Sequence, residues 1–242
     1  MSPHLFRVFL DGNRSELARK LLIATGVQDQ LPKLRGIEQF WGTSVLQCPY
    51  CEGWEFQDAP IAVYGKRLRG FEMARAMSAW TSDIVLCSDG RASLKANEIA
   101  ELARNGIELI EDRIAELSGC NGQLEAVVFR GGRRLQCRAL FFDTPCVSQS
   151  RLAVKLGCRL TKGGGIRCGQ YEATDVPGVF VAGNIIDDVQ LAIVAAAEGA
   201  RAAFGINRSL TREDFDRRAT GVQHVEHPQV DDKNVQRRRP RT

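Results

Sequence analysis

Residues 61–70 read Ile-Ala-Val-Tyr-Gly-Lys-Arg-Leu-Arg-Gly, a short apolar run that enters a turn bounded by Gly65 and Gly70. Apolar residues at helical spacing follow over residues 71–80, and residues 83–87 (Asp-Ile-Val-Leu-Cys) form a second short apolar run. A strand, a tight glycine turn, a helix and another strand in this order predict a βαβ unit. The fold class is therefore α/β with a parallel sheet.

The glycine turn is a candidate phosphate-binding site, because such a turn and the N-terminus of the next helix together hold a pyrophosphate. Gly65 and Gly70 occupy the first and third positions of the pattern Gly-x-Gly-x-x-Gly. Arg67 replaces the middle glycine, which normally lets the backbone approach the pyrophosphate. Either Arg67 and its basic neighbours contact phosphate directly, or the turn binds a dinucleotide poorly. A structural turn without a ligand is the third alternative.

Two charged residues follow the second apolar run. Asp89 is placed to bind a ribose hydroxyl, and Arg91 is placed to meet a 2′-phosphate. The sequence therefore leaves the choice between NADH and NADPH open. Further along, Gly131-Gly132 separates two half-buried apolar runs, 124–130 and 134–138, and predicts a hairpin.

The second motif is Cys48-Pro49-Tyr50-Cys51, followed directly by Glu52. Two thiols at this spacing form and break a disulfide, and the local field can turn one of them into a nucleophilic thiolate. Glu52 is placed to donate or accept protons during the exchange. The alternatives are an inert reduced pair and half of a zinc site, which needs two more cysteines to converge. The six other cysteines are scattered, which is typical of small buried hydrophobic residues.

Length and composition describe an ordinary folded protein of 242 residues, with 44% hydrophobic and 26% charged residues. No apolar stretch approaches the roughly 18 residues of a membrane span, and the N-terminus lacks a signal-peptide pattern, so we expect a cytoplasmic protein without membrane association. The net charge of +4 depends on residues 233–242, which hold five cations and no acid. A short basic tail is weak evidence for a nucleic-acid partner, and we expect none.

In their order along the chain, these motifs resemble the thioredoxin reductase-like branch, class II, of the pyridine nucleotide-disulfide oxidoreductases. In that branch a redox CxxC lies shortly before the NAD(P)-binding glycine turn, as Cys48 and Cys51 precede Gly65, and an acidic residue follows it, as Glu52 does here. The same tetrapeptide occurs in glutaredoxins, but their single small domain is much shorter than this chain. Three more segments agree with the resemblance: residues 22–26 (Leu-Ile-Ala-Thr-Gly), residues 174–184 (Thr-Asp-Val-Pro-Gly-Val-Phe-Val-Ala-Gly-Asn) and residues 189–191 (Val-Gln-Leu).

The resemblance implies a flavoprotein fold with two dinucleotide-binding domains and a three-layer ββα sandwich. We expect an NAD(P)-binding domain over residues 41–147, which carries the CxxC. Two pieces of an FAD-binding domain, 1–40 and 148–216, flank it, and a disordered tail follows over 217–242. Nothing before Ala24 resembles the glycine-rich turn that grips the ADP half of FAD. We therefore expect the FAD domain to be incomplete at its N-terminus.

The function that the resemblance implies is electron transfer from NAD(P)H through FAD to the Cys48–Cys51 disulfide. The partner would be a thioredoxin-like protein or a small-molecule disulfide or dithiol, and the protein would form a homodimer. Cys51 would face the flavin, Cys48 would attack the substrate and Glu52 would supply protons. Some relatives instead oxidise dithiols with oxygen, and the residues do not separate the two directions.

The expected cofactors are FAD and NADP, with NAD as the alternative, and no metal ligand is expected. Asn184 stands where most relatives have aspartate. A flavin-free remnant that acts as a nucleotide-binding or interaction module is the alternative function, favoured by Arg67 and by the missing fingerprint. The candidate cofactor-binding residues are Thr25, Gly26, Gly65, Arg67, Gly70, Asp89, Arg91, Gly183, Asn184, Gln190 and Leu191.

Overall fold

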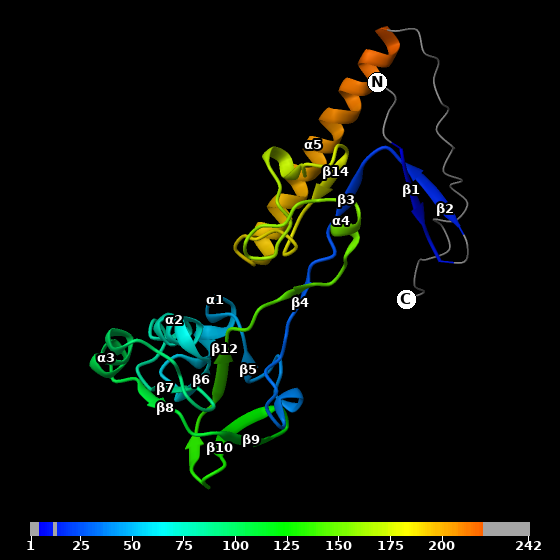
Figure 1. Ribbon diagram of the computed structural model, residues 1–242. Coiled ribbons are helices and arrows are strands. Elements are labelled where there is room, and N and C mark those ends of the chain that lie inside the picture. Colours follow the sequence, from blue (N-terminus) through cyan, green and yellow to red (C-terminus); the bar gives the residue numbers. More distant parts are fainter. Residues whose placement is uncertain (1–4, 12–13, 220–242) are drawn as a thin grey trace, which may run out of the picture. The chain divides into compact units, whose positions relative to one another are not determined.

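The computed structural model describes residues 5–11 and 14–219, which fall into two compact units (Figure 1). The central unit is Gln28–Val147, and the terminal unit combines Met1–Val27 with Ser148–Thr242. The chain thus begins in the terminal unit, forms the central unit and then returns.

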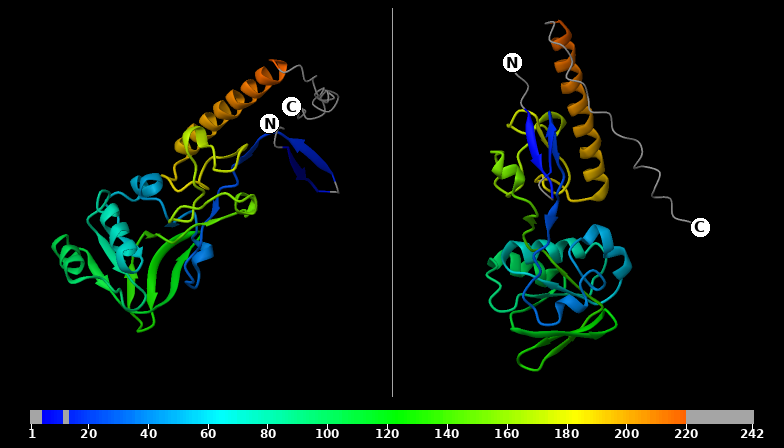
Figure 2. Two further views of the ribbon diagram at one scale, coloured as in Figure 1. Left: turned by 45° about the horizontal axis from the view of Figure 1, so that its top comes forward. Right: turned by 90° about the vertical axis from the view of Figure 1, so that its right-hand side faces the viewer.

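A five-stranded parallel sheet, in the order β5-β12-β6-β7-β8, is the middle layer of the central unit. Helices α2 and α3 cover one face, and the antiparallel sheet β11-β10-β9 covers the other (Figures 1 and 2). Val63 and Phe141 pack on the helical side, whereas their neighbours Ala62 and Phe142 pack on the opposite side, as side chains alternate along a strand. The three-layer ββα sandwich is confirmed. The bounds are β5 Val45–Leu46, β6 Ile61–Tyr64, α2 Arg67–Met77, β7 Ile84–Cys87, α3 Ala96–Arg104, β8 Glu108–Ile110, β9 Ile114–Cys120, β10 Gln123–Phe129, β11 Arg134–Gln136 and β12 Ala139–Phe142.

The central unit begins at residue 28, before the boundary at residue 41 that the sequence suggests. Leu34, Ile37 and Phe40 are buried in the cluster between the parallel and antiparallel sheets. Their burial holds the segment before residue 41, including the 3-10 helix η1 (Ile37–Gln39), on this unit.

Two hairpins build the antiparallel layer. Gly131 and Gly132 lie between β10 and β11, which pair in antiparallel fashion, so the predicted hairpin is confirmed. Strand β9 is not expected from the sequence patterns; Asn121-Gly122 joins it to β10 in a tight turn with φ of 50° and 76°. Asparagine followed by glycine favours this turn, because both central residues need positive φ.

The terminal unit is built around a parallel pair, β3 (Leu21–Ile23) with β14 (Val179–Val181). Ile23 and Val181 share a hydrophobic cluster with Ile166 and Ile185. An antiparallel pair, β1 with β2, precedes β3, and the strands β4 and β13 pair where the chain passes between the units. The remaining bounds are β1 Phe6–Phe9, β2 Ser15–Ala18, β4 Val27–Gln28, β13 Val147–Ser148, α4 Leu152–Lys155, η3 Gln170–Glu172 and α5 Ala192–Ala219.

Helix α5 runs to Ala219, and so residues 217–219 are helical where we expected the disordered tail to begin. Arg19 pairs with Glu213 and Asp214, each at 2.8 Å, and Lys20 also pairs with Glu213. These ion pairs hold the polar end of the helix on the terminal unit, although its apolar periodicity has ended. The rest of the expected tail lies outside the described residues.

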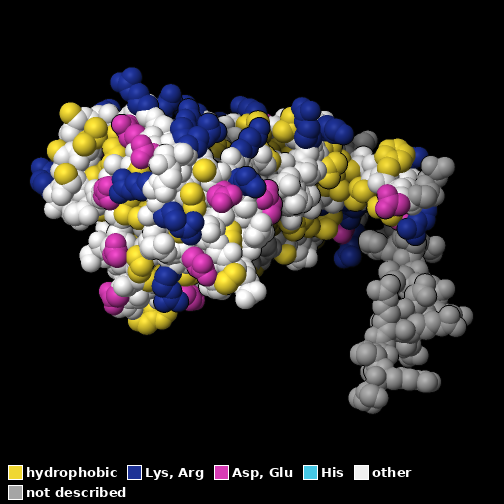
Figure 3. All heavy atoms as spheres, turned by 90° about the horizontal axis from the view of Figure 1, so that it is seen from below, with side chains coloured by type: hydrophobic (Ala, Val, Ile, Leu, Met, Phe, Trp, Pro, Cys, Tyr) yellow, Lys and Arg dark blue, Asp and Glu magenta, His cyan; other side chains and the backbone are white. Residues whose placement is uncertain are grey.

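Within the described ranges, every helix is too short or too polar to cross a membrane. On the face drawn in Figure 3, Lys and Arg side chains lie among Asp, Glu and apolar side chains. The distribution of charge on this face is mixed.

Candidate redox and nucleotide-binding sites

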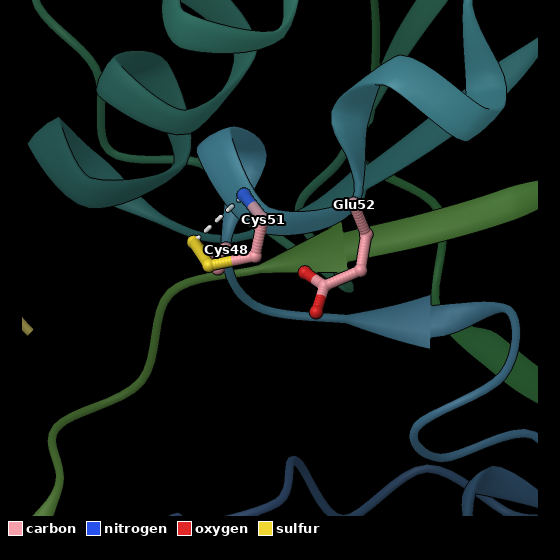
Figure 4. A group of neighbouring side chains, drawn as sticks. All are labelled: Cys48, Cys51 and Glu52. Atoms are coloured by element: carbon pink, nitrogen blue, oxygen red, sulfur yellow. Dashed lines mark hydrogen bonds between the residues drawn. A yellow bond between two sulfur atoms is a disulfide. The ribbon is translucent and has the colours of Figure 1, made fainter. Parts of the chain in front are cut away.

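Cys48 and Cys51 form a disulfide in the central unit, with their Cα atoms 5.3 Å apart (Figure 4). Cys48 is the N-cap of the short helix α1 (Pro49–Glu52), which follows β5. Pro49 suits the first helical position, where its missing N–H costs nothing, and it favours extended backbone at Cys48 (φ −101°, ψ 107°). The sequence thus folds locally so that two cysteines three residues apart meet.

The surroundings of the disulfide distinguish its two sulfurs. The backbone N–H of Cys51 donates to Sγ of Cys48 at 3.1 Å. Such a donor stabilises negative charge on sulfur once the disulfide is reduced. Cys51 is exposed and Cys48 is half-buried. Tyr50, which lies between the two cysteines in the sequence, and Trp54, three residues after Cys51, are 79% and 68% exposed.

Glu52 is half-buried beside the disulfide, and its carboxylate turns back toward the sulfurs (Figure 4). Its ligand atom and those of Cys48 and Cys51 all lie within 4.8 Å of one another. Burial, and then the charge of Glu55, raise the pKa of the Glu52 carboxyl above its ordinary value. Glu52 therefore keeps a proton to higher pH than an exposed glutamate does, which suits a group that exchanges protons with thiols.

The glycine turn between β6 and α2 has the close packing that a dinucleotide turn requires. A Cβ atom on Gly65 would lie 2.5 Å from Cα of Gly70, and one on Gly70 would lie 2.6 Å from the carbonyl carbon of Gly65. Arg67 has φ 53°, in the left-handed region that favours glycine. Its N–H donates to the carbonyl of Ala92 at 2.8 Å, and its side chain is exposed. The turn therefore keeps the backbone conformation of the Gly-x-Gly-x-x-Gly pattern. Arg67 adds a positive charge at the position where the pattern's middle glycine would let the backbone approach a phosphate.

Asp89 and Arg91 follow β7 but have different surroundings. Oδ1 of Asp89 accepts the N–H of Ile114 at 2.8 Å, and Oδ2 lies 3.5 Å from the Arg113 guanidinium. Its carboxylate therefore holds the start of β9 in place, a role that the sequence analysis did not assign. Arg91 is exposed. At this edge of the sheet the carboxylate is already bonded within the protein, and Arg91 faces solvent.

The candidate flavin-binding residues lie in the terminal unit. Thr25 and Gly26 follow β3, and Gly183 and Asn184 follow β14, so that all four gather at the carboxyl edge of one parallel pair. Gly26 (φ 66°) has open space where a Cβ would be. Gln190 and Leu191 directly precede α5, which begins at Ala192, so they lie before the helix that the resemblance would direct at a bound ring.

One buried carboxylate in this unit escaped the sequence analysis. Oε2 of Glu198 accepts the N–H of Gly183 at 2.7 Å, and Glu198 is 7% exposed. The sequence signal for a buried role was a single glutamate inside an alanine-rich helix. This signal does not identify the hydrogen-bond partner, Gly183, which lies on a different segment of the chain. The N–H that the resemblance would turn toward a cofactor phosphate is thus bonded to the protein.

Beside Glu198 lies a cavity of about 380 Å³ with a second buried carboxylate. Glu172 is 3% exposed and pairs with Arg201 at 3.2 Å, while its Oε2 has no hydrogen-bond partner among the described residues. Burial raises the pKa of the Glu172 carboxyl, Arg201 lowers it and Glu198 raises it, with a net upward shift.

The residues fit the two expected cofactors to different extents. The turn at Gly65 and Gly70 retains the close approach that a dinucleotide fold requires, and basic side chains surround it. In the terminal unit, the residues that the resemblance assigns to the ring and ribityl side of a flavin follow β3 and β14 or precede α5. For the ADP half of FAD, the described residues include no glycine-rich βαβ turn before β3.

Comparison with known proteins gives a consistent result. Residues 7–199 match the family model described as "Pyridine nucleotide-disulphide oxidoreductase". The thioredoxin reductase of Aquifex aeolicus is 24% identical, covering 85% of this chain and 66% of the relative. The glucosaminate ammonia-lyase of Pseudomonas fluorescens is 30% identical, covering 78% and 64%. A crystal structure assigned to a thioredoxin reductase of Bacillus anthracis superimposes with a TM-score of 0.81 at 28% identity, covering 88% of this chain and 72% of that one. The chain thus spans less than two thirds of the length of these curated relatives.

Proposed function

Because this chain belongs to the pyridine nucleotide-disulphide oxidoreductase family, in its thioredoxin reductase-like part, we propose that it acts as an NAD(P)H- and FAD-dependent disulfide oxidoreductase. Electrons reach the Cys48–Cys51 disulfide and pass to a thioredoxin-like protein or a small-molecule disulfide. The observation that carries the proposal is the disulfide itself, with exposed Cys51 and with the Glu52 carboxylate beside it.

Each cofactor has a proposed set of residues. Thr25, Gly26, Gly183, Asn184, Gln190 and Leu191 would hold the flavin. Gly65, Gly70, Arg67 and Arg91 would hold the nicotinamide dinucleotide. Asp89 supports the loop beside it through Ile114. Because its carboxylate is engaged and Arg91 is exposed, we favour NADPH over NADH.

A bound flavin would supply the electron pair that reduces the disulfide. The S–S bond then breaks, and two protons convert the pair to thiols, with Glu52 donating and regaining a proton from solvent. The Cys48 thiol then loses its proton to solvent, and the resulting thiolate, stabilised by the N–H of Cys51, attacks the partner disulfide. This forms a mixed disulfide and releases one partner thiol. Cys51 next attacks Sγ of Cys48, which restores the internal disulfide and releases the second thiol.

A specific observation favours the second candidate function, a flavin-free binding module. Gly183 donates its N–H to buried Glu198, and Arg67 donates its N–H to Ala92. Neither amide is free to bind a phosphate oxygen. Such a module would bind a nucleotide through the basic side chains of the glycine turn, without electron transfer.

Purification of the full chain distinguishes the two functions. A reductase is yellow, or becomes yellow with added FAD, and consumes NADPH when a disulfide acceptor is present. Cys48→Ser should abolish disulfide turnover and leave flavin reduction by NADPH intact, whereas Cys120→Ser, which changes an exposed free cysteine elsewhere, should change neither. A colourless chain that is inert with added FAD supports the module, and turnover retained by Cys48→Ser excludes the disulfide from the reaction.

A further inference from the structure

Cys48, Cys51 and Glu52 form the one group of at least three potential metal ligands that converges among the described residues. None of the six other cysteines joins it, so a four-cysteine zinc site does not form in this part of the chain. The third ligand is instead a carboxylate. The three ligand atoms lie within 4.8 Å of one another, on one short turn of backbone.

This spacing is close to what a tetrahedral zinc ion requires. Zn–S bonds of about 2.3 Å and Zn–O bonds of about 2.1 Å place neighbouring ligand atoms roughly 3.5–3.8 Å apart. The 5.3 Å between the Cα atoms of Cys48 and Cys51 permits this once the sulfurs are no longer bonded to each other. Small side-chain rotations bring Glu52 to the same point, because its carboxylate already faces the sulfurs (Figure 4).

The oxidation state of the cysteines decides whether the ligands exist. The sulfurs of a disulfide carry no thiolate charge and bind zinc poorly, whereas the thiolates of the reduced pair are strong ligands. We infer that the reduced Cys48–Cys51 pair and Glu52 form a redox-gated site for a thiophilic divalent cation, with Zn²⁺ as the representative ion. This inference rests on the proposed function, since the same disulfide must open and close.

The binding step balances without any oxidant or reductant. Two thiols each release a proton to solvent, the hydrated Zn²⁺ ion loses water ligands as two Zn–S bonds and one Zn–O bond form, and one water keeps the fourth position. Occupied sulfurs neither attack a partner disulfide nor rejoin, so the ion holds the pair reduced and stops turnover. Oxidation of the pair cannot proceed until the ion leaves.

Zinc binding by the full chain tests the site directly. The protein is reduced with a phosphine, desalted anaerobically and titrated with Zn²⁺ against a chromophoric chelator, beside the same protein in its disulfide form. We expect one tight Zn²⁺ per reduced chain and affinity at least about 100-fold weaker in the disulfide form, as the loss of both thiolates requires. Glu52→Gln should weaken binding by about tenfold or more, and its matched control Glu55→Gln should not.

Two cysteine variants measure how much Zn²⁺ the other thiols bind. Cys48→Ser should lose the tightly bound Zn²⁺, whereas Cys120→Ser, which removes an exposed free cysteine, should keep it. Equal binding by the reduced and disulfide forms, or by Glu52→Gln and Glu55→Gln, would overturn the inference. Chemically reduced protein needs no flavin, so zinc binding is independent of electron supply. If the chain binds zinc but never reduces a partner disulfide, only the proposed function fails; if it reduces a partner and ignores zinc, only this inference fails.

Discussion

Substitution of Gly65 by alanine tests the packing of the glycine turn most directly. The new methyl group would lie 2.5 Å from Cα of Gly70 and 3.0 Å from its nitrogen. Carbon atoms in contact are normally about 3.5–4.0 Å apart, so the N-terminus of α2 must move away from β6 by about an ångström. Both atoms belong to the backbone, and no side-chain rotation relieves the contact.

The expected loss of stability follows from two opposing effects. Overpacking of this kind costs about 1–3 kcal/mol. Replacing glycine by alanine also stiffens the unfolded chain and returns about 0.4–1 kcal/mol. The clash is larger, and the net loss should be about 1–2 kcal/mol. At a urea dependence of about 2 kcal/mol per M, the unfolding midpoint should fall by roughly 0.5–1 M.

Tryptophan fluorescence during urea unfolding is the appropriate assay, since all three tryptophans, Trp41, Trp54 and Trp80, lie in the central unit. The matched control is Gly131→Ala, because a Cβ there meets nothing within 4 Å and the position does not need positive φ. NADPH affinity should also fall for Gly65→Ala. If its midpoint stays within about 0.2 M of the control and of the unchanged protein, the close approach does not constrain the turn.

Three other substitutions test separate groups. Arg67→Gly should weaken NADPH binding by about tenfold, or ~1.4 kcal/mol, since it removes a cation that we propose holds the pyrophosphate; tighter binding in a fluorescence titration would show that the Arg67 side chain obstructs the phosphate instead. The raised pKa of Glu52 keeps its carboxyl protonated to higher pH, so the rate at which the Cys48–Cys51 disulfide is reduced, the step in which Glu52 donates a proton, should decline as pH rises through that pKa, and Glu52→Gln should flatten this limb of the pH–rate profile. Arg201→Ala should destabilise the terminal unit by about 1 kcal/mol, a small value because the Arg201 side chain is 60% exposed. The pKa of Glu172 is raised in the fold, so protonation of its carboxyl at lower pH favours the folded state. Arg201 is needed only when Glu172 is charged, so the stability lost in Arg201→Ala should grow from mildly acidic to neutral pH when it is measured by hydrogen exchange. A loss of stability that does not depend on pH would contradict this account.

Local patterns were sufficient for much of the fold and of the candidate site. The βαβ unit, the hairpin at Gly131-Gly132 and the redox spacing of Cys48 and Cys51 all depend on residues close together in the chain. Apolar periodicity, turn-forming residues and short motifs all report constraints between residues that are close in sequence, so they predict these features. Strand β9 was missed because its clearest signal, Asn121-Gly122, was not used.

The remaining features depend on contacts between residues far apart in sequence. Asp89 is bonded to the N–H of Ile114, and Gly183 donates to Glu198. The end of α5 is retained by Arg19, some two hundred residues earlier. Whether a carboxylate is free to bind a ribose or is already hydrogen-bonded depends on which backbone groups the fold brings beside it. Residue type and local spacing therefore predict which groups of this protein could take part in chemistry, and tertiary packing decides which of those groups are already hydrogen-bonded within the fold.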